Sequence, residues 1–96
     1  LNAFAPVSFV EGYLSGRGVV KIIWKPHPNP AISGYIIERK VSGANWKYLA
    51  RVSGRLMPEY IDKSARVGYE YSYRLIARAS NGAKSTASDS VSLIVK

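Results

Sequence analysis

Residues 69–79 read YEYSYRLIARA, and their apolar side chains fall on alternate positions. Side chains of a β-strand point alternately to the two faces of a sheet, so this pattern predicts a strand with one buried face. The Asn81-Gly82 pair that follows favours a tight hairpin turn, because both residues tolerate positive φ. A last strand near residues 91–95 is therefore expected to pair antiparallel with this one. The side chains expected on the buried face are Tyr71, Tyr73, Leu75, Ala77 and Ala79.

A second alternating stretch lies earlier in the chain, where Val20, Ile22 and Trp24 alternate with Lys21, Ile23 and Lys25. The first set is expected to enter the core, with Trp24 filling it. Proline cannot donate to a ladder, so the strand should end at the prolines that follow. Further strands are predicted at residues 34–40, with Tyr35 and Ile37 inward, and at residues 46–52 and 56–61. No segment has helical periodicity, so the chain is expected to be all-β.

Composition limits the class of protein further. The chain has 96 residues, 47% of them hydrophobic, a formal net charge of +8 and no cysteine. This length suits one core, so residues 1–96 are expected to form a single domain excised from a longer multidomain chain. Disulfides, thiolate metal sites and a cysteine nucleophile are excluded. No apolar run approaches the ~20 residues of a membrane helix.

The predicted strands resemble the fibronectin type III family over nearly the whole chain. The resemblance implies a seven-stranded antiparallel Greek-key β-sandwich of the immunoglobulin-like class. It also implies that Tyr71 forms the tyrosine corner of the family, with its hydroxyl bonded to backbone upstream. The segments that carry the resemblance are Val20-x-Ile22-x-Trp24, residues 32–37 (ISGYII), residues 60–62 (YID), Gly68-x-x-Tyr71-x-Tyr73-Arg74-Leu75-x-Ala77, and residues 80–85 (SNGAKS).

Catalytic chemistry has no support in the residues. The chain contains one histidine, His27, and six Asp and Glu residues that are scattered along it. General acid–base or triad chemistry needs titratable groups that converge on one pocket. A lone histidine without cysteine is too little for a zinc site. No Gly-rich loop opens a helix to hold phosphate. We therefore expect no enzyme, no cofactor and no metal.

The most unusual segment is residues 24–30, which read WKPHPNP. Alternating prolines favour an extended, polyproline-like ridge, which would display Lys25, His27 and Asn29 as ligand-binding residues at little entropic cost. The alternative is that the prolines only stiffen the loop after the strand. The segment also resembles a Trp-basic-Pro-His-Pro-acidic stretch of fibronectin-like lipoproteins, with Asn29 at the acidic position. Those lipoproteins are surface adhesins of Gram-negative bacteria, and the resemblance implies docking on host fibronectin.

A second candidate surface is the outward face of two neighbouring strands, with Trp46 or Tyr48 at its edge. Mixed charge on such a face is ordinary, whereas apolar side chains there could form a small patch for a partner. Both interpretations stay open. Nucleic-acid binding is not expected, because the basic residues form no run and the core takes most aromatics. The residues on this face are Ile36, Glu38, Lys40, Arg74, Ile76 and Arg78.

The sequence thus predicts a non-catalytic protein-binding module of a bacterial surface adhesin. Its expected partners are host extracellular-matrix fibronectin and neighbouring type III domains of the same chain. Its expected location is extracellular or at the cell surface, attached to the outer membrane in the full-length protein. The alternative is a structural spacer without a ligand, which holds other domains apart in a secreted or surface protein.

Overall fold

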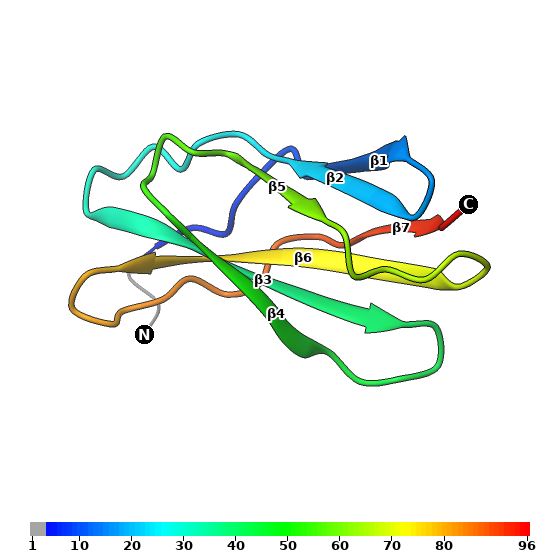
Figure 1. Ribbon diagram of the computed structural model, residues 1–96. Coiled ribbons are helices and arrows are strands. Elements are labelled where there is room, and N and C mark those ends of the chain that lie inside the picture. Colours follow the sequence, from blue (N-terminus) through cyan, green and yellow to red (C-terminus); the bar gives the residue numbers. More distant parts are fainter. Residues whose placement is uncertain (1–3) are drawn as a thin grey trace.

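The structure is a computed structural model that describes residues 4–96, and it contains two antiparallel β-sheets packed face to face (Figure 1). One sheet has the strand order β1-β2-β5 and the other has the order β4-β3-β6-β7. The described residues contain no helix with the length and apolarity needed to cross a bilayer. The strands are β1 (Glu11–Gly16), β2 (Val19–Ile23), β3 (Ile32–Val41), β4 (Lys47–Ser53), β5 (Glu59–Asp62), β6 (Glu70–Ala79) and β7 (Val91–Ile94).

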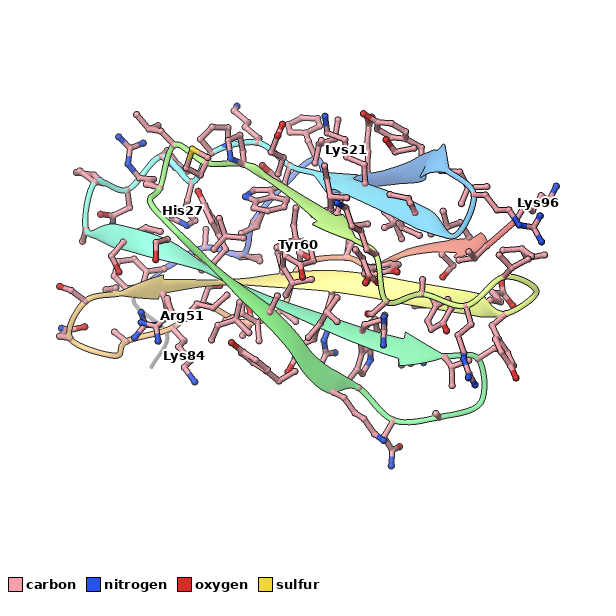
Figure 2. The ribbon with its side chains drawn as sticks, in the orientation of Figure 1. Lys21, His27, Arg51, Tyr60, Lys84 and Lys96 are labelled. Carbon is pink, nitrogen blue, oxygen red and sulfur yellow. The ribbon has the colours of Figure 1, made fainter. Side chains whose placement is uncertain are left out.

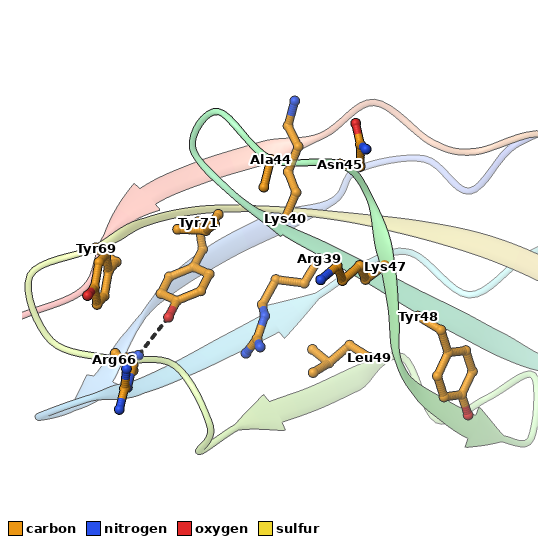
Figure 3. Close-up of a pocket in the computed structure, with 11 residues that line it drawn as sticks. Arg39, Lys40, Ala44, Asn45, Lys47, Tyr48, Leu49, Arg66, Tyr69 and Tyr71 are labelled. Atoms are coloured by element: carbon orange, nitrogen blue, oxygen red, sulfur yellow. Dashed lines mark hydrogen bonds between the residues drawn. The ribbon is translucent and has the colours of Figure 1, made fainter.

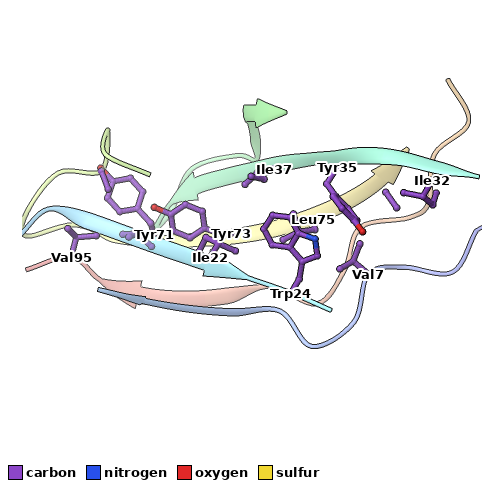
Figure 4. Close-up of a cluster of buried hydrophobic side chains, with 13 residues drawn as sticks. Val7, Ile22, Trp24, Ile32, Tyr35, Ile37, Tyr71, Tyr73, Leu75 and Val95 are labelled. Atoms are coloured by element: carbon purple, nitrogen blue, oxygen red, sulfur yellow. The ribbon is translucent and has the colours of Figure 1, made fainter. Parts of the chain in front are cut away.

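The core lies between the sheets and is built from the alternate positions that the sequence predicted. Tyr35 and Ile37 of β3 and Tyr73 of β6 are fully buried. Trp24 is 4% exposed and meets Tyr35 edge to face, with ring centroids 5.2 Å apart (Figure 4). The two ten-residue strands β3 and β6 pair antiparallel along their length and form the centre of the larger sheet. The predicted seven-stranded antiparallel sandwich is confirmed.

The corner tyrosine is also confirmed. The hydroxyl of Tyr71 accepts a 3.0 Å hydrogen bond from the backbone N–H of Arg66. Arg66 lies in the segment that crosses from β5 in one sheet to β6 in the other. The bond therefore fixes this crossover against the second sheet.

The connection after β6 departs from a simple two-residue hairpin. Gly82 has a φ of 90° and the chain turns there as expected, but β7 begins only at Val91. Between them, serine hydroxyls supply part of the ladder: Ser85 Oγ accepts from Ala77 N, and Ser88 Oγ accepts from Leu75 N, both at 2.9 Å. Side-chain oxygens thus satisfy N–H groups of β6 that a regular strand would have paired.

The strand predicted at residues 56–61 is shorter than expected. It begins at Glu59, directly after Pro58, and the chain before it is a turn that contains Gly54 at a φ of 96°. Leu56 and Met57 consequently lie outside the strand, 66% and 56% exposed. A period-two pattern could not separate these two apolar residues from the strand that follows them.

Candidate functional site

His27 does not lie on a displayed ridge, and this part of the prediction is wrong. The residue is 3% exposed, and its side chain points into the molecule from the loop between β2 and β3 (Figure 2). Its Nδ1 accepts a hydrogen bond from Asn29 N at 3.1 Å, and its Nε2 lies 2.8 Å from the carbonyl oxygen of Ala5. The ring thus satisfies both nitrogens internally, and it ties the N-terminal segment to the loop.

Internal hydrogen bonds also hold the rest of this loop. Asn29 is half-buried, and its Oδ1 accepts from Ala31 N at 2.9 Å in a local turn. Tyr35 Oη donates to the carbonyl oxygen of Arg55 at 2.6 Å and accepts from His27 N at 2.8 Å. The prolines therefore belong to a rigid loop with internal bonds. Of the three predicted ligand-binding residues, Lys25 alone has an exposed side chain.

Lys25 belongs to a surface that the sequence did not reveal. Its Nζ lies 5.5 Å from the ring centroid of Phe9, which is 75% exposed. The β2–β5 register, continued by the bond from Trp24 N to Pro58 O, places Met57 across from Lys25 on the same face. We define the Phe9 surface as three residues at the loop end of the three-stranded sheet: Phe9, Lys25 and Met57.

The backbone of Phe9 is unusual. Its φ is 55°, which makes it the one non-glycine residue with positive φ among the described residues. This left-handed conformation costs a residue with a Cβ roughly 1–2 kcal/mol. The neighbours of Phe9 do not follow from a local sequence pattern, because they depend on how the segment before β1 packs beside the segment after β2. A backbone turn signal such as Gly or Asn was absent at this position.

The outward face of β3 and β6 is assembled as the sequence predicted. Glu38 lies opposite Arg74 in register, with Oε1 2.7 Å from Nε, and Ile36 lies opposite Ile76. Trp46 lies beside this pair, with the guanidinium of Arg74 4.3 Å from its ring centroid. Both isoleucines are half-buried, so they form no open apolar patch.

The buried polar residues near the other end of β5 form a closed cluster. Asp62 is 1% exposed, and its carboxylate accepts from Tyr73 Oη at 2.6 Å, Arg39 Nη1 at 2.8 Å, and Ser64. Burial by itself raises the pKa of Asp62, but the hydrogen bonds from Tyr73, Ser64 and Arg39 outweigh it and hold the pKa below its ordinary value. Both oxygens are satisfied by the protein, so the cluster has the character of a structural link.

The described side chains that could bind a metal ion are not grouped together. Among residues 4–96, no group of three or more His, Cys, Asp or Glu side chains is arranged to hold a metal ion.

Comparison with known proteins identifies the fold. No family model and no curated protein matches the sequence. Among solved structures, the twitchin kinase region from C. elegans matches with a TM-score of 0.82 at 21% identity, over 96% of this chain and 16% of that one. An Fn3-like protein from Clostridium thermocellum matches with a TM-score of 0.79 at 22% identity, over 95% and 92% of the two chains. Chicken CNTN1 domains FN1-FN3 match with a TM-score of 0.85 at 14% identity, over 97% and 31%. These likenesses establish the fibronectin type III fold for this chain.

Proposed function

We propose that this domain is a non-catalytic protein-binding module and that the Phe9 surface is its ligand-binding site. The observation that carries the proposal is the exposed ring of Phe9, which is 75% accessible although its φ is 55°. Backbone strain at an exposed aromatic residue is typical of functional positions, because burial of the ring cannot be what maintains it. Fold alone does not identify a function, so the proposal rests on this site.

The composition of the Phe9 surface indicates the kind of partner. Phe9 and Met57 supply apolar contact area, and Lys25 supplies a cation beside them. Aromatic and methionine side chains are enriched in the centres of protein interfaces. The rigid loop behind Lys25 keeps the entropic cost of binding low. A partner with an apolar side chain next to a carboxylate matches this surface.

Host fibronectin is the first partner that we propose to test, with an extracellular or cell-surface location for the domain. The support is the resemblance of residues 24–29 to the adhesin segment, of which Lys25 is the exposed member. In this proposal, His27 and Asn29 hold the loop in shape by internal hydrogen bonds and do not contact the partner.

The test is binding of the single domain to immobilised fibronectin at physiological and high salt. The variant Phe9→Gly/Lys25→Ala removes the ring and the cation. A matched control, Tyr13→Ser/Lys21→Ala, removes an aromatic and a lysine from the same sheet at positions that pair directly with each other. We expect the parent protein to bind saturably at both salt concentrations. The Phe9→Gly/Lys25→Ala variant should lose this binding, and the control variant should keep it. Equal binding by both variants would contradict the proposed site, and no binding at either salt would contradict fibronectin as the partner.

The second candidate function is a spacer between other domains of a longer chain. It is favoured by the similarity to parts of larger proteins, since this chain spans 16% of the twitchin structure and 31% of the CNTN1 structure. In that case the contacts of the domain are with neighbouring type III domains. If the domain is a spacer, the isolated domain should bind no separate ligand, and its contacts should be with the domains attached to it.

A further inference from the structure

We propose that an acidic peptide segment of another protein binds in extended conformation along the free edge of β4, with alternate side chains entering the groove beside it. This site is separate from the Phe9 surface and does not depend on it. The ligand is identified by its chemistry: alternating carboxylate and apolar side chains on an extended backbone.

The groove lies between the β3–β4 hairpin and the segment that links β5 to β6 (Figure 3). Its volume is about 360 Å³, which is enough for one large side chain and part of the chain around it. Val41, Leu49 and the ring of Tyr71 line it, so an apolar side chain would be shielded from water there. Tyr69 and Tyr48 add aromatic area at its rim.

The charged side chains that line this groove are positive. Among the described residues, the lining includes four cations and no carboxylate. Two of the cations are already engaged, because Arg39 pairs with Asp62 and Lys40 lies over the Trp46 ring. The other two, Lys47 and Arg66, are exposed and have no ion-pair partner within residues 4–96. They flank the groove and attract a carboxylate on either side of an apolar anchor.

The backbone at this edge is available for pairing. Within the part of the chain that the structure describes, β4 has β3 on one side in its sheet and no strand on the other. Gly54 N donates to Ser33 O, and bonded pairs in an antiparallel ladder recur at every second residue. The β3–β4 register therefore turns the N–H and C=O groups of Arg51 and Ser53 toward the free side. An extended peptide can add there by main-chain hydrogen bonds.

Charge also decides which strand can add. Lys47 and Arg51 stand on this edge, and cations on an edge strand oppose pairing with a second copy of a chain whose net charge is +8. An acidic segment experiences the opposite effect. Because side chains alternate along a strand, one set would face the groove and the other would lie beside Tyr48 on the outer face.

The experiment measures fluorescence anisotropy of a labelled eight-residue peptide of alternating Glu and Leu, with a Lys-Leu peptide of the same length as control. Lys47→Glu/Arg66→Glu reverses the two free cations. Arg51→Pro removes a free edge N–H as well as the charge, and Arg51→Ala removes the charge alone. Circular dichroism and urea unfolding confirm that each variant is folded.

We expect the Glu-Leu peptide to bind and the Lys-Leu peptide not to bind. Charge reversal should weaken binding about tenfold or more, given the usual strength of charge-assisted contacts. Arg51→Pro should bind about fivefold more weakly than Arg51→Ala, as expected for loss of one hydrogen bond. The Phe9→Gly/Lys25→Ala variant should bind the peptide like the parent protein.

Three results would overturn the proposal. Equal binding of the two peptides would show apolar adhesion without charge recognition. Equal affinity of Arg51→Pro and Arg51→Ala would exclude strand addition at this edge. Loss of peptide binding in Phe9→Gly/Lys25→Ala would place the peptide on the Phe9 surface and leave the groove without a ligand.

Discussion

The hydroxyl of Tyr73 donates a 2.6 Å hydrogen bond to Oδ2 of Asp62, and this buried bond joins the two sheets at the end of β5. Arg39 of β3 donates to the same oxygen at 2.8 Å, so two strands of the larger sheet hold one carboxylate of the smaller sheet. Ser64 satisfies Oδ1 with its N–H and its hydroxyl. The buried charge is therefore fully paired, and loss of any one partner leaves a polar group unsatisfied.

Replacement of Asp62 by asparagine should destabilise the domain by about 3 kcal/mol, within the range for breaking a buried ion pair from one side. The amide presents an NH₂ group to donors on Arg39, Tyr73 or Ser64, and the charge of Arg39 loses its partner. Tyr73→Phe removes one bond and should cost less, about 1–2 kcal/mol. Urea unfolding at pH 7 measures both. A larger loss for Tyr73→Phe than for Asp62→Asn would contradict this description of the cluster.

The pH dependence of stability follows from the same carboxylate. The hydrogen bonds hold the pKa of Asp62 in the folded state below its ordinary value of 3.8. The unfolded chain therefore takes up this proton first as the pH falls, and the stabilisation that is present above the unfolded pKa is lost through the folded pKa. We expect the free energy of unfolding to fall below about pH 5. In Asp62→Asn, the free energy of unfolding should decrease less steeply as the pH falls below about 5. An unchanged decrease would show that other carboxylates cause it.

The residues explain why the sequence predicted the fold better than the site. Tyr35, Ile37 and Tyr73 lie on strands with one buried face, and such strands leave a period-two pattern in the sequence. Phe9 and Met57 become neighbours of Lys25 only through the pairing of three separate segments, which leaves no local pattern. The proline pattern predicted a stiff loop but not the direction of the His27 ring, which depends on the N-terminal segment packed against it.

Tyr71→Phe should lower the free energy of unfolding by about 1–3 kcal/mol, because it leaves the N–H of Arg66 without its acceptor. The ring itself remains in the core, so the packing is unchanged. Binding at the Phe9 surface should be unaffected, since Tyr71 does not belong to it. Urea unfolding of the two proteins in parallel makes the measurement. A variant as stable as the parent protein would show that the corner hydrogen bond contributes nothing.

Gly34→Ala should destabilise the domain by about 1–3 kcal/mol through overpacking. A Cβ at this position would collide with the backbone carbonyl oxygen of Val52 on the neighbouring strand, and a backbone atom cannot turn aside like a side chain. Gly43→Ala is the comparison, since a Cβ there meets no atom within 4 Å but the φ is 84°. Its cost should come from the backbone alone, about 1 kcal/mol. Thermal unfolding that ranks Gly34→Ala as the milder change would contradict the close approach of β3 and β4.

Phe9 gives the clearest separation of stability from function. Its φ of 55° suits glycine, so Phe9→Gly should be at least as stable as the parent protein. Phe9→Ala keeps the strained backbone and should be less stable than Phe9→Gly by about 1 kcal/mol. Both variants remove the ring and should bind the partner equally weakly. If Phe9→Gly proved less stable than Phe9→Ala, the backbone at Phe9 would carry no strain. The exposed ring would then be kept at no cost in stability, and binding would not be needed to explain its presence.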